Sequence, residues 1–171
     1  MHNKFAGTRP TVSRGFTLVE VMVALVIFSI GLLGLAGLQA SGIRSNNLSM
    51  SRSMAMIQAY NIADRIRANA AGMANGDYDN VTTTIGGAPT SCIANQCTPD
   101  QLAAFDIWEW NNFNKKLLPK GRGTVTRINP APATLFRITV MWDEDRTGAT
   151  GENCSGNSAV DLKCYTMTVE F

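Results

Sequence analysis

The sequence predicts an α+β protein in which one long N-terminal helix, its first half transmembrane, packs on a small head made of an antiparallel sheet and one additional helix. Three observations predict this class. Residues 16–38 are almost entirely apolar, and residues 39–71 continue without proline. Residues 135–142 and 164–171 alternate between apolar and polar side chains, as half-buried strands do.

The composition excludes several function classes. The 171 residues are 45% hydrophobic and only 16% charged, with a formal net charge of +2. These values fit neither a disordered chain nor the basic excess of a nucleic-acid-binding domain. The single histidine, His2, precedes any structured pattern, so catalysis or metal binding through histidine is not expected. We expect no enzyme and no cofactor.

The N-terminal 38 residues have the charge distribution of a membrane anchor. Lys4, Arg9 and Arg14 lie in residues 1–15, which contain no acid, and residues 16–38 then contain one charge. This stretch of 23 residues is long enough for a hydrocarbon core of about 30 Å. It is longer than the apolar core of a cleaved signal peptide. The leading cations predict a cytoplasmic N-terminus and a head on the other side of the membrane.

Glu20 is the charged residue inside the apolar stretch. A carboxylate there costs about 2.5–3.5 kcal/mol on membrane-insertion scales, and no cation lies within one helical turn of it in the stretch. Cleavage between Gly15 and Phe16 would create an amine four residues away. The amine of the same chain or of a neighbouring chain could then neutralise Glu20.

The helix is expected to run from Phe16 to about Ala71, because Gly72 and the Asn-Gly pair at 75–76 are stop and turn signals. Its second half, residues 39–71, is amphipathic. One face carries the apolar positions at helical spacing, namely Leu48, Ala55, Ala59, Ile62 and Ile66.

The head, residues 72–171, begins with a loop over residues 72–91 that contains a short strand at 80–85. A second helix starts with Thr98 as its N-cap and Pro99 as its first residue, and it stops at residues 119–121. Its predicted buried face consists of Leu102, Phe105, Trp108 or Ile107, and Leu118. Trp108 and Trp110 cannot both face the core, so one is expected in the core and the other at the rim. The three main strands are predicted at 123–128, 135–142 and 164–171.

The four cysteines lie on the side of the membrane where disulfides persist. Of the three possible connectivities we favour the local one, because each pair then brackets a loop: Cys92 with Cys97, and Cys154 with Cys164. A four-cysteine zinc site is the alternative, but its usual paired short spacings are absent.

Two charged clusters are candidate binding sites. The acidic loop over residues 143–152 could hold calcium, but it lacks the alternating oxygen donors of a calcium loop, so a solvated hairpin loop is favoured. Its carboxylates are Asp143, Glu144, Asp145 and Glu152. The basic cluster is short and more typical of a solvated surface than of a nucleic-acid site. It comprises Lys115, Lys116, Lys120 and Arg122.

The start of the chain resembles the class III signal of type IV pilins and pseudopilins, a basic leader ending in glycine, then Phe-Thr-Leu-x-Glu, then an apolar helix. The match includes Gly15, Phe16, Thr17, Leu18 and Glu20. The resemblance implies the type IV pilin fold, cleavage after Gly15 by a prepilin peptidase, and methylation of the Phe16 amine. It also implies that Glu20 helps to register a subunit against its neighbour. The processed chain would have 156 residues and a formal charge of −1, because three cations leave with the leader.

Four head motifs resemble minor pilins of the PilV type, also called type IV pilus modification proteins. They are residues 63–69 (ADRIRAN), the Cys-x4-Leu-Ala-x-Phe-Asp run at 97–106, Glu109-Trp110, and Leu-Pro-x-Gly at 118–121. The resemblance implies a structural subunit that primes or joins type IV pili near the tip and supports pilus biogenesis, twitching motility and adhesion.

The implied partners are other minor pilins, the major pilin, the prepilin peptidase and the assembly platform. The implied location is the inner membrane, with a single span, a cytoplasmic N-terminus and a periplasmic head, and later the cell-surface pilus. Two alternatives stay open. One is a pseudopilin of a type II secretion system, and the other is a DNA- or surface-binding module on a pilin scaffold, although we do not expect nucleic-acid binding.

Overall fold

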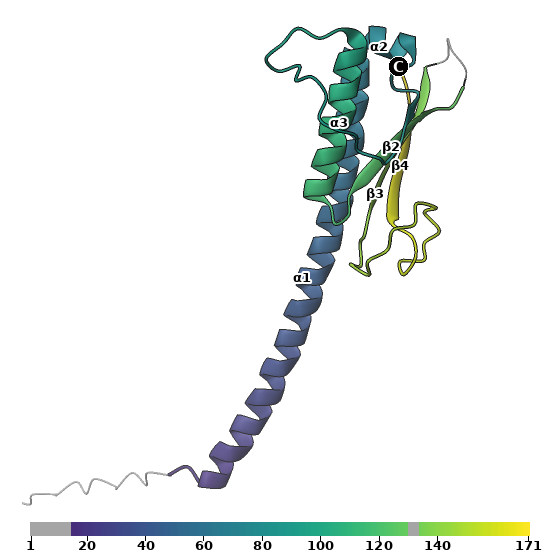
Figure 1. Cartoon of the computed structure of the whole chain (residues 1–171). Coiled ribbons are helices and arrows are strands. Elements are labelled where there is room, and N and C mark those ends of the chain that lie inside the picture. Colours follow the sequence, from purple (N-terminus) through teal and green to yellow (C-terminus); the bar gives the residue numbers. More distant parts are fainter. Residues whose placement is uncertain (1–14, 130–133) are drawn as a thin grey trace, which may run out of the picture. The chain divides into compact units, whose positions relative to one another are not determined.

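The structure, a computed structural model, describes residues 15–129 and 134–171. The chain divides into two compact units, one ending at Arg44 and the other comprising Ser45–Phe171, which we call the head. Helix α1, Leu18–Ala68, begins in the first unit and ends in the head (Figure 1). By length and composition it can cross a membrane. Except for Gly15, the predicted leader lies outside the described residues.

The part of α1 in the head buries the face that its periodicity predicts. Ala55, Ala59, Ile62 and Ile66 are fully buried, and Leu48 is half-buried. Their spacing of three, four or seven residues places them on one side of the helix. This apolar stripe is therefore the surface on which the remainder of the head is built.

Helix α1 ends earlier than predicted, at Ala68 instead of Ala71, and a separate short helix, α2 (Ala70–Asn75), follows. The interruption is at Asn69, whose side chain has three partners of its own. Its Nδ2 donates to the carbonyl of Pro99 at 2.7 Å and to Tyr78 Oη at 3.1 Å, and its Oδ1 accepts from the Gly72 N–H. A side chain that bonds locally in this way competes with helical hydrogen bonding. The prediction of one additional helix was therefore incomplete.

Helix α3, Pro99–Leu117, begins where the sequence predicts, but it buries a different face. Thr98 and Gln101 form a capping box at its start. The buried positions include Ala103, Asp106, Trp110, Asn111 and Asn114, whereas the expected Leu102 and Phe105 are only half-buried. The prediction is confirmed for Leu118, which is buried, and for Ile107, which packs against the core. It was wrong for Leu102 and Phe105, because it counted apolar residues and this buried face contains three polar ones.

Two interactions attach α3 to α1 within the head. The buried Trp110 donates its indole N–H to the carbonyl of Gln58 at 2.8 Å. Arg65 pairs with both Asp106, at 3.0 Å, and Glu109, at 2.7 Å. Because residue 110 lies near 58 while 106 lies near 65, the two helices run in opposite directions along each other (Figure 1).

Asp106 also accepts a hydrogen bond from the Tyr78 hydroxyl at 2.8 Å. The ring of Tyr78 is fully buried, and this burial raises the pKa of its hydroxyl well above the usual range. The hydroxyl therefore stays protonated and able to donate. The bond joins the segment after α2 to the ion pair between α1 and α3.

The sheet has four antiparallel strands in the order β1-β2-β3-β4. The strands are β1 (Asn80–Val81), β2 (Arg122–Arg127), β3 (Leu135–Trp142) and β4 (Lys163–Glu170). The prediction for β3 is confirmed, and β2 and β4 are each displaced by one residue. Strand β1 is shorter than the predicted 80–85. Thr83 instead donates its hydroxyl to Glu152, on the loop between β3 and β4.

The main core lies between the sheet and the helices. Phe136, Ile138, Val140 and Trp142 of β3 face it and are almost fully buried. On the opposite side of β3, Met141 packs with Ala149 and Leu162 in a second, smaller cluster. The loop between β3 and β4 thus covers part of the outer face of the sheet.

Candidate assembly segment and head surface

The first turn of α1 is capped by the threonine of the N-terminal motif. Thr17 Oγ1 accepts from the Glu20 N–H at 3.2 Å, and the Thr17 carbonyl accepts from the Val21 N–H at 3.3 Å. Thr-x-x-Glu is the spacing of a capping box. It places the Glu20 carboxylate in the first helical turn, where the helix dipole favours a negative charge. This capping role of Thr17 is readable from the sequence but was not predicted.

Glu20 lies in the middle of an exposed apolar stripe. Phe16, Ala24 and Phe28, at intervals of four residues, line the same shallow hollow on the helix. Within residues 15–129 and 134–171, the Glu20 side chain has no hydrogen bond or ion pair, and Phe16 is 82% exposed. Both groups are therefore free to contact another molecule.

The apolar residues of this segment are exposed along its length, from Phe16 through Leu38 to Ile43. Exposure of this much apolar surface to water is unfavourable by about 25 cal/mol per Å². Lipid or neighbouring apolar helices must therefore cover the segment.

The head contains both disulfides that the sequence favours. Cys92 is bonded to Cys97 and Cys154 to Cys164, which leaves no free cysteine among the described residues. The first disulfide closes the loop that leads into α3, and the second ties the loop after β3 to the start of β4. With all four sulfurs bonded to each other, no thiolate remains to bind zinc.

We expect the Cys154–Cys164 disulfide to stabilise the head, because it restricts the unfolded chain. The paired replacement Cys154→Ser with Cys164→Ser should lower the free energy of unfolding by about 2–3 kcal/mol. Urea denaturation of the oxidised protein, with non-reducing peptide mapping of both pairs, measures this. The matched control replaces Cys92 and Cys97, whose loop is shorter. A variant as stable as the parent, or a map with crossed pairs, would contradict the expectation.

The carboxylates of the acidic loop have separate intramolecular partners. Asp143 accepts from the backbone N–H groups of Thr147, at 3.0 Å, and Gly148, at 2.9 Å, and so it holds the turn. Glu144 pairs with Arg52 of α1 at 2.8 Å, and Glu152 pairs with Arg122 at 2.7 Å.

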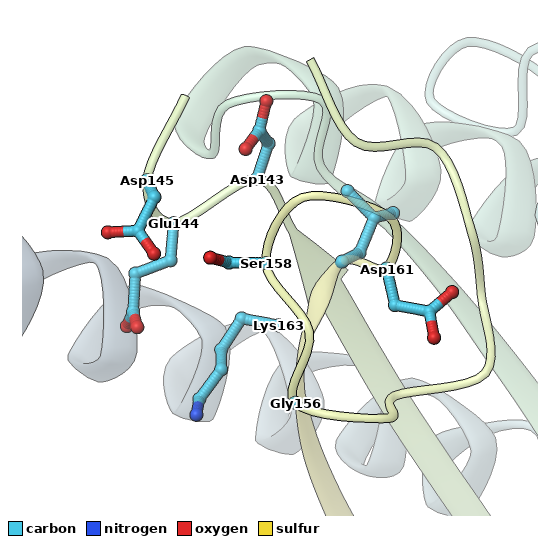
Figure 2. Close-up of a pocket in the computed structure, with 8 residues that line it drawn as sticks. Asp143, Glu144, Asp145, Gly156, Ser158, Asp161 and Lys163 are labelled. Atoms are coloured by element: carbon cyan, nitrogen blue, oxygen red, sulfur yellow. The ribbon is translucent and has the colours of Figure 1, made fainter. Parts of the chain in front are cut away.

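A fourth carboxylate, that of Asp161, lines the same pocket as Asp143, Glu144 and Asp145. The carboxylates of Asp143 and Asp161 are directed away from each other, so these two do not converge on one point (Figure 2). Asp161 accepts from Ser155, and this hydrogen bonding lowers its pKa. In the described part of the chain, no group of three His, Cys, Asp or Glu side chains could hold a metal ion. The geometry favours turn formation over calcium binding.

The residues of the basic cluster do not act together: two of them bond to the loop between β3 and β4, and Lys116 lies on α3 itself. Lys120 donates to the Gly148 carbonyl at 2.5 Å, and Arg122 pairs with Glu152. Lys116 lies over the ring of Phe113, 5.9 Å from its centroid. The cations therefore do not form a continuous stripe of the kind that follows a nucleic-acid backbone.

The tryptophans of α3 separate as expected, with Trp110 in the core and Trp108 half-buried at the rim. Gly123 of β2 shows how closely the core packs around Trp110. A side chain at residue 123 would begin 2.3 Å from the Trp110 ring. Only glycine fits at this contact.

A long N-terminal helix packed on a small antiparallel four-stranded sheet, with extra helices, is the type IV pilin fold. Residues 37–108 match the family model described as Tt1218-like, type IV pilin Tt1218. Residues 11–36 match the prokaryotic N-terminal methylation motif. No curated protein and no solved structure matches the chain. The two family matches support a type IV pilin subunit, and the methylation motif together with the apolar N-terminal helix indicates membrane anchoring and later incorporation into a pilus. Pilins are structural and generally non-enzymatic.

Proposed function

We propose that the chain is a minor pilin of the PilV type that primes assembly of type IV pili or joins them near the tip. The observation that carries this proposal is the exposed apolar start of α1, where Gly15 and Phe16 precede the helix, Glu20 lies in its first turn, and all three fall within the methylation motif. The head motifs at 63–69, 97–106 and 118–121 support the PilV type.

In this proposal the subunit acts through packing alone. Cleavage after Gly15 frees the amine of Phe16, which is then methylated. Until assembly, the apolar part of α1 stays in the inner membrane, with the head in the periplasm. On assembly, Glu20 pairs with the Phe16 amine of an adjacent subunit, and this relieves the cost of its charge in an apolar environment.

The proposed partners are the prepilin peptidase, the assembly platform, the major pilin and other minor pilins. Through them the chain would support pilus biogenesis, twitching motility and adhesion. The disulfide-bonded head suits an oxidising compartment and the cell surface.

Quantitative mass spectrometry of sheared fibres tests the minor role. We expect far less of the processed chain than of the major pilin in the fibres, because a priming or tip subunit is needed once per fibre while the major pilin repeats along it. Deletion of the chain should reduce the number of fibres and twitching. The comparison strain lacks pilus assembly altogether and controls for membrane contamination. Amounts equal to the major pilin, or absence from fibres, would contradict the minor-pilin proposal.

A further inference from the structure

Among the residues that the structure describes, no strand pairs with the outer edge of β4. It is the last strand in the order β1-β2-β3-β4, and it pairs with β3 over all eight of its residues. The Phe171 N–H, just beyond it, bonds to the Thr134 carbonyl on the β3 side. Because backbone groups alternate in an antiparallel pair, Thr166, Thr168 and Glu170 direct their N–H and C=O groups away from β3.

The edge lacks most of the usual features that prevent further pairing, and its charged side chains, Lys163 and Glu170, are confined to the two ends of the strand. Natural edge strands are commonly short, or contain proline, a bulge or an inward-pointing charge. Strand β4 is eight residues long and follows one uninterrupted register with β3, and it contains no proline. By comparison, the opposite edge, β1, is only two residues long.

The core face of the sheet is only partly covered at this edge. On β3 the core-facing Phe136, Ile138 and Val140 are fully buried. Their neighbours on β4, Tyr165 and Met167, remain half-buried although they belong to the same core. The apolar layer therefore extends beyond the part that the helices cover.

A groove lies beside this edge, between β4 and the part of α1 in the head. It has a volume of about 420 Å³, and its lining includes Met56 of α1 together with Trp142, Lys163 and Tyr165. Met56 is 44% exposed. The buried indole N–H of Trp142 has no hydrogen-bond partner in the described part of the chain. The groove thus combines apolar side chains with two cations, Lys163 and the Arg52 that is paired with Glu144.

We propose that β4 receives an extended strand from the head of a neighbouring pilus subunit, added antiparallel to the sheet; this rests on the proposed pilin function. Strand addition uses main-chain hydrogen bonds for affinity and alternate side chains for specificity. Here the added strand would direct alternate apolar side chains into the groove against Met56 and Tyr165. The added strand should also carry an acidic residue near Lys163. This lysine is exposed, and it has no ion pair within the described residues.

The direction of the strands explains why another pilin head is a suitable donor. In four consecutive antiparallel strands, β1 and β4 run in opposite directions. Two heads of this fold that lie side by side in the same orientation therefore bring β4 of one antiparallel to the β1 edge of the other. Subunits anchored in one membrane through the same end share such an orientation.

Photo-crosslinking in the full chain, in its own cells, tests the proposal. A benzophenone amino acid replaces Thr168, an exposed residue of β4, and the matched control replaces Arg137. Arg137 is the direct partner of Thr168 in the register, on the same exposed face, but it lies on the interior strand β3. We expect adducts at 168, with at most weak labelling at 137. Mass spectrometry should place the adduct on an extended edge segment of another pilin head.

A second variant tests the main-chain bonding itself. With the benzophenone at Glu170, the added change Thr168→Pro should reduce the adduct about tenfold, because proline removes an outward N–H that β3 does not use. Thr168→Val, which keeps the N–H, should not reduce it. Both variants should retain the two disulfides and the thermal unfolding temperature of the parent.

Equal labelling at 168 and 137, adducts with lipid or with a helix of the neighbour, or an unchanged adduct in Thr168→Pro would overturn strand addition. These results are distinguishable from failure of the proposed function. If the chain is cleaved after Gly15 and is present in fibres, but residue 168 gives no specific adduct, only the strand-addition inference fails. If the chain is neither cleaved nor found in fibres, the pilin function itself fails.

Discussion

Replacement of Gly15 by leucine should leave the protein as a full-length precursor in the membrane, with almost no mature form. The peptidase must fit the backbone on both sides of the bond between Gly15 and Phe16, and a branched side chain next to that bond obstructs it. The subunit itself should tolerate the change, because a side chain at residue 15 meets no atom of the described residues within 4 Å. N-terminal sequencing and intact mass then distinguish a chain that begins at Met1 from one that begins at Phe16.

The control for this experiment is Gly42→Leu. Residue 42 is another glycine with no atom within 4 Å of an added side chain, and it lies well after the cleavage site. This variant should be processed normally, which would attribute the effect of Gly15→Leu to cleavage and not to added bulk. The interpretation of the leader would be wrong if Gly15→Leu still yielded a Phe16 N-terminus, or if the unmodified protein in fibres began at Met1.

The second large effect is expected from Glu20→Gln, which should reduce incorporation into fibres more than tenfold. Glutamine keeps the size and hydrogen-bonding capacity of Glu20 but removes its charge. The helix cap stays, because Thr17 Oγ1 accepts from the backbone N–H of residue 20 and not from its side chain. A charge pair in an apolar environment can contribute a few kcal/mol, and about 1.4 kcal/mol already corresponds to a tenfold change.

The measurement is the ratio of the variant in sheared fibres to the variant in membranes, at native expression. Glu20→Gln should still insert, be cleaved after Gly15 and form both disulfides. The matched control is Val21→Gln, which places the same amide on the adjacent residue while the acid remains. Normal incorporation of Glu20→Gln would contradict the pairing role proposed for this carboxylate, but it would not contradict the assignment of the pilin fold.

Much of the fold could be predicted because its periodic elements are apolar on one side. The α1 stripe from Ala55 to Ile66 and the alternation along β3 depend on spacing alone, and both agree with the structure. The ends of such elements can be predicted only where capping or helix-breaking residues mark them. Thr98, as a cap, and Pro99, as a favoured first residue, marked the start of α3 in this way.

The buried face of α3 could not be predicted in the same way. Asp106, Asn111 and Asn114 look like surface residues in a sequence, yet they are buried. Asp106 is accepted in the interior because Arg65 and Tyr78, which are distant in sequence, supply its partners. Such a pairing depends on the tertiary arrangement, so the local pattern contains no sign of it.

The candidate site was predictable to a similar degree. The N-terminal motif and the favoured cysteine pairs follow from residues close together in the chain. The partners of the acidic loop, such as Arg52 for Glu144, come from another element and are visible only in the structure. The open edge of β4 also depends on strand order, which alternation within a single strand does not determine.

The opposed directions of α1 and α3 have a mechanical consequence. A tensile force applied along α1 acts parallel to the seam between the two helices, so it loads the Gln58–Trp110 bond and the Arg65 ion pairs together, in shear. A force that peeled α3 away would instead break these contacts one after another. Shear loading of several bonds at once resists rupture better than sequential peeling. The rest of the head is therefore fastened to α1 most firmly along the axis of that helix.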